Sequence, residues 1–129
     1  MKLLSGALFA IAFACLGVAP AAAAETAAFT PAAFEAAQKA GEPILVDISA
    51  TWCSTCKAQA LILNKLFSEP KFKNLHVFDI DFDSQKDSMR KFGAQDRATL
   101  IVFKGTKEEG RSVFDTNQAS IEALLGKGL

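Results

Sequence analysis

The chain has 129 residues, with 14 basic and 14 acidic side chains and a formal net charge of zero. This length predicts one domain. The balanced charge provides no basic excess for binding nucleic acid or an anionic membrane surface, so we exclude nucleic acid as a partner.

Residues 1–24 have the order of a secretory signal peptide. Lys2 precedes a largely apolar run over residues 3–18, and small residues follow, with Ala22 and Ala24 at the −3 and −1 positions of a cleavage site. We therefore expect cleavage after Ala24. The apolar run is short for a membrane span, which favours removal of the segment over its retention as an anchor.

The mature domain is expected to comprise residues 25–129 and to reside in the periplasm. Cys15 lies in a weak match to a bacterial lipoprotein cleavage box, but Phe13 suits that box poorly, so lipid anchoring through Cys15 is disfavoured. Exported proteins work where disulfides persist. The two cysteines that remain are only three positions apart, so a bond between them would constrain the unfolded chain little.

Helix and strand signals alternate in the first half of the mature chain. Thr30 and Pro31 predict a helix start, and Gly41 marks its end. The β-branched run over residues 44–48 predicts a buried central strand. A long helix over about 53–67 follows, with one expected apolar stripe formed by Ala58, Leu61, Ile62, Lys65 and Leu66.

The second half predicts a strand over 75–81, a short helix over 84–92 with Ser84 as its N-cap, and a strand over 99–103. A tight turn leads to a strand over 111–114, and a last helix runs from Asn117 to Gly126. This order predicts an α/β domain: a three-layer α/β/α sandwich with a mixed central sheet.

The pair Cys53 and Cys56 falls where a buried strand passes into a helix. At a helix N-terminus, free amides and the helix dipole lower the pKa of a thiol, so Cys53 is the candidate nucleophile. Cys56 lies one turn further on and can attack the mixed disulfide that Cys53 forms. The intervening Ser54 and Thr55 are expected to tune the reduction potential.

Metal binding is the main alternative for this pair. Structural zinc requires four ligands, whereas the mature chain has only Cys53, Cys56 and His76 as soft or nitrogen ligands, so we expect no zinc site. Copper(I) suits two thiolates, and a copper carrier remains the alternative function. Asp79, Asp81 and Asp83 resemble the start of a calcium loop, but Ser84 and Arg90 stand where such a loop requires glycine and glutamate. We therefore interpret these acids as a strand end and turn.

The segment around the cysteines resembles the thioredoxin family. The likeness covers the chain from about Phe34 to its C-terminus and is carried by residues 44–50, Trp52-Cys53-x-x-Cys56-Lys57, 78–81, 91–93 and 99–105. It implies a thioredoxin fold and thiol–disulfide exchange with protein partners, without a cofactor. It also implies that the protein is a monomer and, by likeness to periplasmic members, that a membrane-bound reductase supplies its electrons. Lys57 and the thioredoxin-like residues around it favour a role as reductant over a role as oxidant or isomerase.

The resemblance also assigns roles near the pair. Asp47 matches the family's buried acid, which relays a proton to or from Cys56; its other interpretation is a hydrogen-bonded strand residue. Trp52 would shape the docking surface, and Lys57 would hold negative charge close to the thiols.

The sequence departs from the family on one docking surface. Ala98 replaces the cis-proline that precedes the residue matching Thr99, and the bond before a non-proline residue is expected to be trans. Arg97 replaces an apolar residue, which would lower the pKa of Cys53 or select an acidic partner. Phe114 stands where the family often has glycine. We expect an altered docking surface and a dedicated partner.

Overall fold

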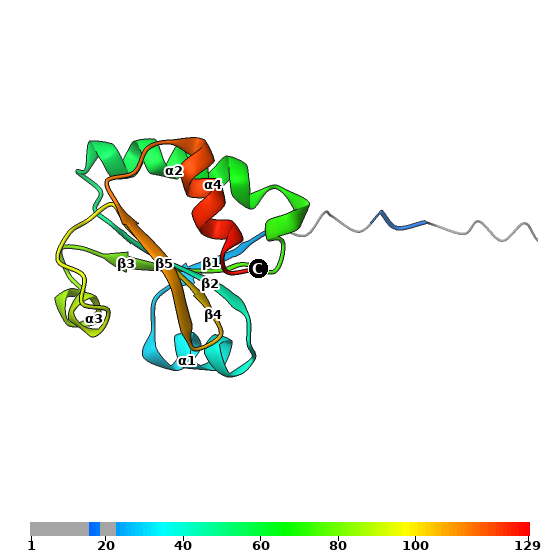
Figure 1. Cartoon of the computed structure of the whole chain (residues 1–129), viewed down its shortest axis with the longest axis horizontal. Helices are drawn as coiled ribbons and strands as arrows, with labels where there is room; N and C mark the ends of the chain where they lie inside the picture. Colours follow the sequence, from blue (N-terminus) through cyan, green and yellow to red (C-terminus); the bar gives the residue numbers. More distant parts are fainter. Residues whose placement is uncertain (1–15, 19–22) are drawn as a thin grey trace, which may run out of the picture.

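The computed structural model describes residues 16–18 and 23–129 (Figure 1). Cys15 and most of the expected signal peptide lie outside the described residues. Within the described ranges, no helix is long and apolar enough to cross a membrane.

Five strands form one mixed sheet in the order β1-β3-β2-β4-β5. Strands β1 (Glu25–Ala28), β3 (His76–Asp81) and β2 (Pro43–Ser49) are parallel, while β4 (Thr99–Lys104) is antiparallel to β2, and β5 (Lys107–Val113) is antiparallel to β4. The expected mixed sheet is confirmed, with β2 and β3 at its centre.

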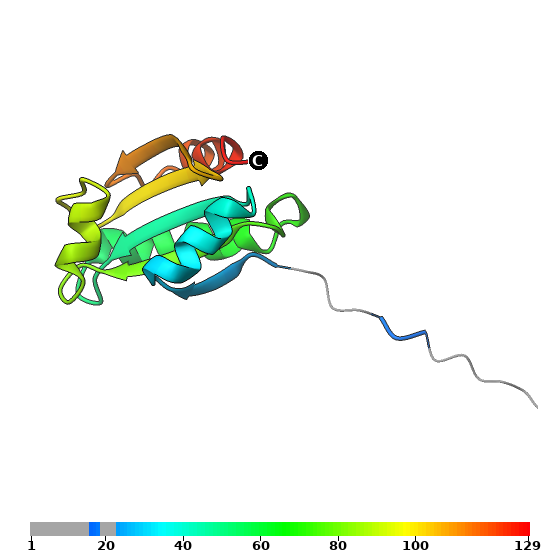
Figure 2. The same cartoon turned by 90° about the horizontal axis from the view of Figure 1, so that it is seen from below.

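Helices cover both faces of the sheet. Helices α2 (Ser54–Phe67) and α4 (Gln118–Gly126) lie on one face, and α1 (Pro31–Lys39) and α3 (Lys86–Lys91) lie on the other, as the two views in Figures 1 and 2 show. A short 3₁₀ helix, Pro70–Phe72, follows α2. This arrangement confirms the expected three-layer sandwich.

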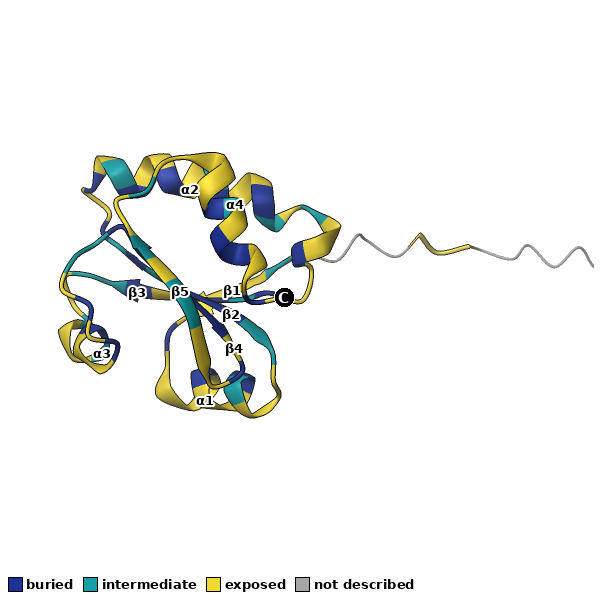
Figure 3. Ribbon diagram, in the orientation of Figure 1, coloured by how far each residue is buried: buried dark blue, intermediate teal, exposed yellow. Residues whose placement is uncertain are grey.

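Two apolar layers fill the space between sheet and helices, where the buried residues gather in Figure 3. On the α1 side, five phenylalanines meet with ring centroids 5.2–6.3 Å apart: Phe29, Phe34, Phe78, Phe92 and Phe103. On the α2 side the layer is mainly aliphatic and includes Leu45, Leu66, Leu100 and Ile121. Burial of these layers is the main stabilising contribution to the domain.

Two expected helix starts are confirmed by their caps. The Thr30 hydroxyl accepts a hydrogen bond of 3.2 Å from the Ala33 amide, and the Asn117 side-chain oxygen accepts one of 2.9 Å from the Ser120 amide. Each bond satisfies a backbone donor that the helix itself leaves free.

The expected cap of α3 is wrong. The Ser84 hydroxyl donates to the Asp81 carboxylate, and the helix begins one residue later, after Gln85, whose side chain makes no capping bond. Ser84 therefore closes the turn after β3, because its hydroxyl donates to the Asp81 carboxylate and does not accept a hydrogen bond from a helix amide.

Two strands differ from the expected pattern. Strand β1 was not predicted, since its four residues are all exposed and show no apolar alternation. Strand β5 begins at Lys107 rather than at residue 111, because edge pairing with β4 holds a segment whose charged side chains face solvent.

The buried stripe of α2 is displaced from the expected one. Leu61 is 76 % exposed, and Ala58 and Lys65 are also exposed, so the expected stripe is wrong at these three positions. The residues that face the sheet are Cys56, Gln59, Leu63 and Leu66. A polar residue, Gln59, lies in the buried stripe, which apolar periodicity alone does not reveal.

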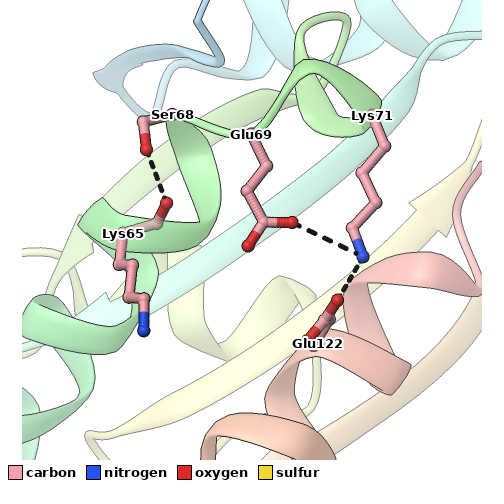
Figure 4. A network of polar contacts seen from close by, with 5 residues as sticks. All are labelled: Lys65, Ser68, Glu69, Lys71 and Glu122. Carbon is pink, nitrogen blue, oxygen red and sulfur yellow. Dashed lines mark hydrogen bonds and ion pairs between the residues drawn. The ribbon is translucent and has the colours of Figure 1, made fainter.

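A surface network joins the end of α2 to α4 (Figure 4). The Lys71 ammonium contacts the carboxylates of Glu69, at 3.5 Å, and Glu122, while the Ser68 hydroxyl donates a 2.7 Å hydrogen bond to the Lys65 carbonyl at the helix end. Exposed ion pairs contribute little to stability, so this network mainly fixes the local geometry.

The chain enters the sheet at Ala24. Its amide donates to the Phe67 carbonyl at 3.2 Å, and the Glu25 amide donates to the Leu75 carbonyl at 3.1 Å. Ala24 is partly buried and packs against the aliphatic layer beneath α2. Residues 24 and 25 are thus part of the folded domain.

Candidate active site

The two cysteines lie where β2 passes into α2. Cys53 is the N-cap of the helix, with extended backbone, and its sulfur accepts a hydrogen bond of 3.1 Å from the Cys56 amide. The pair forms a disulfide with Cα atoms 5.2 Å apart, and Cys53 and Cys56 are only 4 % and 6 % exposed. The amide that contacts the Cys53 sulfur would stabilise a thiolate there after reduction.

The other residues of the motif surround the disulfide unequally. Ser54 is exposed in the first turn of α2, Thr55 is partly buried, and Lys57 is exposed. The Lys57 amide donates to the Cys53 carbonyl at 3.1 Å, closing the first helical turn. The motif therefore presents Cys53 and Cys56 at the helix start with one cationic side chain nearby.

Ala98 forms the opposite wall of the disulfide. It is completely buried in a cluster with Ala50, Cys53 and Cys56. The Arg97–Ala98 bond is trans, as expected, since all peptide bonds of the described residues are trans. The sequence did not predict that Ala98 would adopt φ 56°, the left-handed region that disfavours side chains.

Phe114 adopts the same unusual conformation in the neighbouring loop. Its φ is 60°, and its amide donates a hydrogen bond of 3.0 Å to the Ala98 carbonyl. The ring is 46 % exposed and lies on the surface beside the site. Thr99, in contrast, is buried and its hydroxyl donates to the Asp96 carbonyl at 2.7 Å, so Ala98 and Thr99 shape the surface from beneath.

Gln59 links the loop of Ala98 and the loop of Asp115 to α2, and the sequence analysis did not identify it as a site residue. Its side chain is 1 % exposed, and its amide nitrogen donates to the carbonyls of Ala98, at 3.2 Å, and Asp115, at 2.8 Å. These two bonds satisfy the amide nitrogen, whereas the side-chain oxygen of Gln59 is buried with no hydrogen-bond partner among the described residues. The only sequence signal is an uncharged polar residue three positions after Cys56, which is too common to be informative.

Arg97 lies among three aromatic rings. Its guanidinium carbon is 4.9 Å from the ring centroid of Trp52, 5.6 Å from that of Phe114 and 6.0 Å from that of Phe82. One guanidinium nitrogen lies 3.7 Å from the Asp96 carboxylate. The structure thus brings the predicted residues Trp52, Arg97 and Phe114 together and adds Phe82, which the sequence did not single out.

Trp52 is fixed at the rim of this surface. Its indole nitrogen donates a hydrogen bond of 2.7 Å to the Asp83 carboxylate, and its ring meets Phe82 edge-on at 6.1 Å. Trp52 nevertheless remains 55 % exposed. An exposed, oriented aromatic ring is a suitable contact surface for another protein.

Asp47 lies in β2 beneath the start of α2. It lines a cavity of about 190 Å³ together with Cys56 and Lys57, and a second cavity of about 440 Å³ together with Asp79. Burial and the nearby charge of Asp79 raise the pKa of Asp47 from 3.8 to about 7. A carboxyl group with this pKa can both accept and release a proton near neutral pH.

No group of three or more histidine, cysteine or acidic side chains suited to a metal ion occurs in the described part of the chain. The reactive groups that the arrangement brings together are the sulfurs of Cys53 and Cys56. A mixed sheet between helices, with a Cys-x-x-Cys disulfide at the strand–helix junction, defines the class of thioredoxin-fold disulfide oxidoreductases.

Comparisons with known proteins agree with this class. The sequence model of the thioredoxin family matches residues 25–127. A thioredoxin of Alicyclobacillus acidocaldarius is 30 % identical over 100 residues, which cover 78 % of this chain and 94 % of that protein. Thioredoxin Asp f 29 of Aspergillus fumigatus is 31 % identical over 91 residues, 70 % of this chain and 82 % of that protein.

Among solved structures, the chain is similar to Trxlp from Edwardsiella tarda, with a TM-score of 0.76 and 36 % identity over 78 % of this chain and 98 % of that one. The chain belongs to the thioredoxin family, and it is a thiol–disulfide oxidoreductase that acts on protein thiols and disulfides.

Proposed function

We propose that this protein is an exported reductant of protein disulfides that works as a monomer in the periplasm. The observation that carries the redox part is Cys53 at the N-cap of α2, with its sulfur 3.1 Å from the Cys56 amide. The export part rests on the signal-peptide pattern of residues 1–24. We further propose that a membrane-bound reductase returns the electrons.

The reaction begins with the dithiol form. The Cys53 thiolate attacks one sulfur of a partner disulfide; a bond between Cys53 and the partner forms, and the second partner sulfur leaves as a thiolate, which takes a proton from water. Cys56 then loses its thiol proton to the Asp47 carboxylate. The Cys56 thiolate attacks the Cys53 sulfur, and the Cys53–Cys56 disulfide forms as the bond between Cys53 and the partner breaks. The partner's first sulfur leaves as a thiolate and takes a proton from water, so two electrons have passed to the partner.

The docking surface of this reaction is Trp52, Arg97 and Phe114. Two aromatic rings near a guanidinium group offer apolar contact and a positive charge on the residue before Ala98, which packs against Cys53. We propose that this surface favours partners with an acidic side chain near their disulfide, because a guanidinium group pairs well with carboxylates. Ala98 and Thr99 support it from beneath.

Dithiothreitol-driven reduction of a protein disulfide by residues 25–129 tests the redox function. We expect turnover that Cys53→Ser abolishes, while Cys56→Ser retains the first step and accumulates a covalent complex with the partner. Absence of turnover in the unmodified protein, combined with tight copper(I) binding that either serine variant removes, would instead support a copper carrier.

The export proposal has its own test. The full chain, expressed in a Gram-negative host, is expected in the periplasmic fraction with a mass and N-terminal sequence beginning at Glu25. Recovery of the uncleaved chain in the cytoplasm would contradict export, and a lipid-modified chain beginning at Cys15 would contradict cleavage after Ala24.

A further inference from the structure

Asp47 and Asp79 are direct neighbours on the two central strands. They are paired in the parallel register of β2 and β3, and both line the 440 Å³ cavity beneath α2. Paired residues of parallel strands point to the same face, and the strands are roughly 5 Å apart, so the two carboxyl groups lie close together. Asp47 is partly buried, whereas Asp79 is exposed.

This cavity lies next to a smaller one beside the disulfide. The 190 Å³ cavity that Cys56 lines shares five residues with the larger one: Asp47, Ser49, Ala50, Thr51 and Ala60. Asp47 is therefore common to both spaces. Asp79 lines only the larger cavity, toward the edge of the sheet that β1 forms. Asp47 thus links the surroundings of Cys56 with those of the exposed Asp79 carboxyl group.

Few other charged groups face Asp47. The Asp81 carboxylate accepts a hydrogen bond from the Ser84 hydroxyl, which lowers its pKa and keeps it ionised. Lys57 reaches the smaller cavity from α2. On β4, the partner of Asp47 is the apolar Leu100. The remaining walls are uncharged and include Thr26 and Ala28 of β1, Ala60, Leu63 and Asn64 of α2, and Gln85.

We propose that Asp79 is a positioning residue that acts through Asp47: it holds the proton taken from Cys56 on the carboxyl pair and provides the route by which that proton reaches water. The proposal rests on the proposed reductant function. Two adjacent carboxylates do not ionise independently, so the pair retains one proton until Asp79 passes it to solvent. No bond other than the O–H bonds of the relay forms or breaks in this step.

Burial is the larger cause of the raised pKa of Asp47, and the neighbouring charge of Asp79 raises it further. Asp79→Asn removes the like charge at almost unchanged size, so the Asp47 carboxyl ionises at lower pH. For charges on neighbouring strands near a protein surface, we expect the midpoint to move down by about half to two pH units. Asp79→Glu restores the charge and should restore most of the midpoint.

The test is a titration of the Asp47 carboxyl carbon by NMR in the oxidised protein, which requires no turnover. Asp47→Asn identifies the signal. Asp81→Asn is the matched control. It removes a carboxylate from the same strand and cavity, but Asp81 is not the register partner of Asp47. We expect a downward shift in Asp79→Asn and none in Asp81→Asn. Equal midpoints in the unmodified protein and Asp79→Asn would overturn the proposal.

A second measurement separates this inference from the proposed function. The pH profile of partner release from the Cys53 mixed disulfide should move with the NMR midpoint in Asp79→Asn and return in Asp79→Glu. If the NMR midpoint shifts but the protein shows no Cys53-dependent exchange, the reductant function fails while the coupling of the two carboxyl groups stands. If release occurs with an unshifted profile, Asp79 has no role in it.

Discussion

The Phe114 amide donates a 3.0 Å hydrogen bond to the Ala98 carbonyl, and both residues adopt positive φ, at 60° and 56°. The same carbonyl accepts a second bond from the Gln59 side chain. The two loops facing the disulfide are therefore held as one unit, from α2 and from each other. Non-glycine residues persist in such conformations when the surrounding structure fixes them, as it does at many functional sites.

Restoring the family's proline at position 98 is expected to destabilise this protein. Proline fixes φ near −65°, which is incompatible with the φ of 56° at Ala98, so the loop must rearrange and lose its bonds to Phe114 and Gln59. We expect Ala98→Pro to lower the free energy of unfolding by more than about 1 kcal/mol in urea denaturation. Ala98→Gly, which tolerates positive φ, is the control. A stabilised proline variant would show that the family's loop conformation is accessible to this sequence.

Gln59 is expected to stabilise the site through its two carbonyl contacts. Gln59→Leu removes the bond to the Asp115 carbonyl and one of the two bonds to the Ala98 carbonyl, which keeps its bond from the Phe114 amide, and we expect a cost of about 1–3 kcal/mol. The matched control on the same helix is Leu61→Gln, the reverse change at an exposed position, with an expected effect within about 0.5 kcal/mol. Chemical denaturation of both variants measures the contrast. Similar losses would mean that Gln59 contributes only as an ordinary residue of the helix.

Asp47 makes stability depend on pH. Its pKa is about 7 in the folded protein against 3.8 for the model compound, so between these values the folded state retains a proton that the unfolded state releases. Stability relative to Asp47→Asn therefore falls as pH rises from about 4 to 7 and is level above that range. The variant should be more stable at pH 8 by up to ~4 kcal/mol. Thermal or urea unfolding of the unmodified protein and of Asp47→Asn across this pH range tests the prediction. A stability difference that does not change with pH would contradict it.

Arg97 is expected to affect partner choice. For peptides with a glutamate beside the disulfide, Arg97→Gln should lower kcat/KM by about two- to five-fold, the size of an exposed charge pair, and the loss should shrink at high salt. Peptides with glutamine at that position should be unaffected. Lys104→Gln, at the far end of β4, serves as a control for net charge. Equal losses for both peptides would assign Arg97 to packing against Trp52 and Phe114 rather than to charge recognition.

The architecture was predictable because its signals are local. The strand over 44–48, the capped helix starts at Thr30 and Asn117 and the cysteine pair each follow from a few adjacent residues, and their order determines the sheet. Strand β1 and the burial of Gln59 depend on partners far along the chain, so neither has a local pattern. The left-handed conformation of Phe114 and the pairing of Asp47 with Asp79 likewise arise only once loops and strands meet.

The place where the chain enters the sheet bears on the order of events during biogenesis. The Ala24 and Glu25 amides are both hydrogen-bonded, and Ala24 packs beneath α2, so the bond between them is held in the folded domain. Proteases require an accessible, extended segment. Glu25 stays exposed in β1, but both amides are hydrogen-bonded, so for a chain exported as proposed we expect residues 1–24 to be removed faster before this edge of the sheet closes than after it.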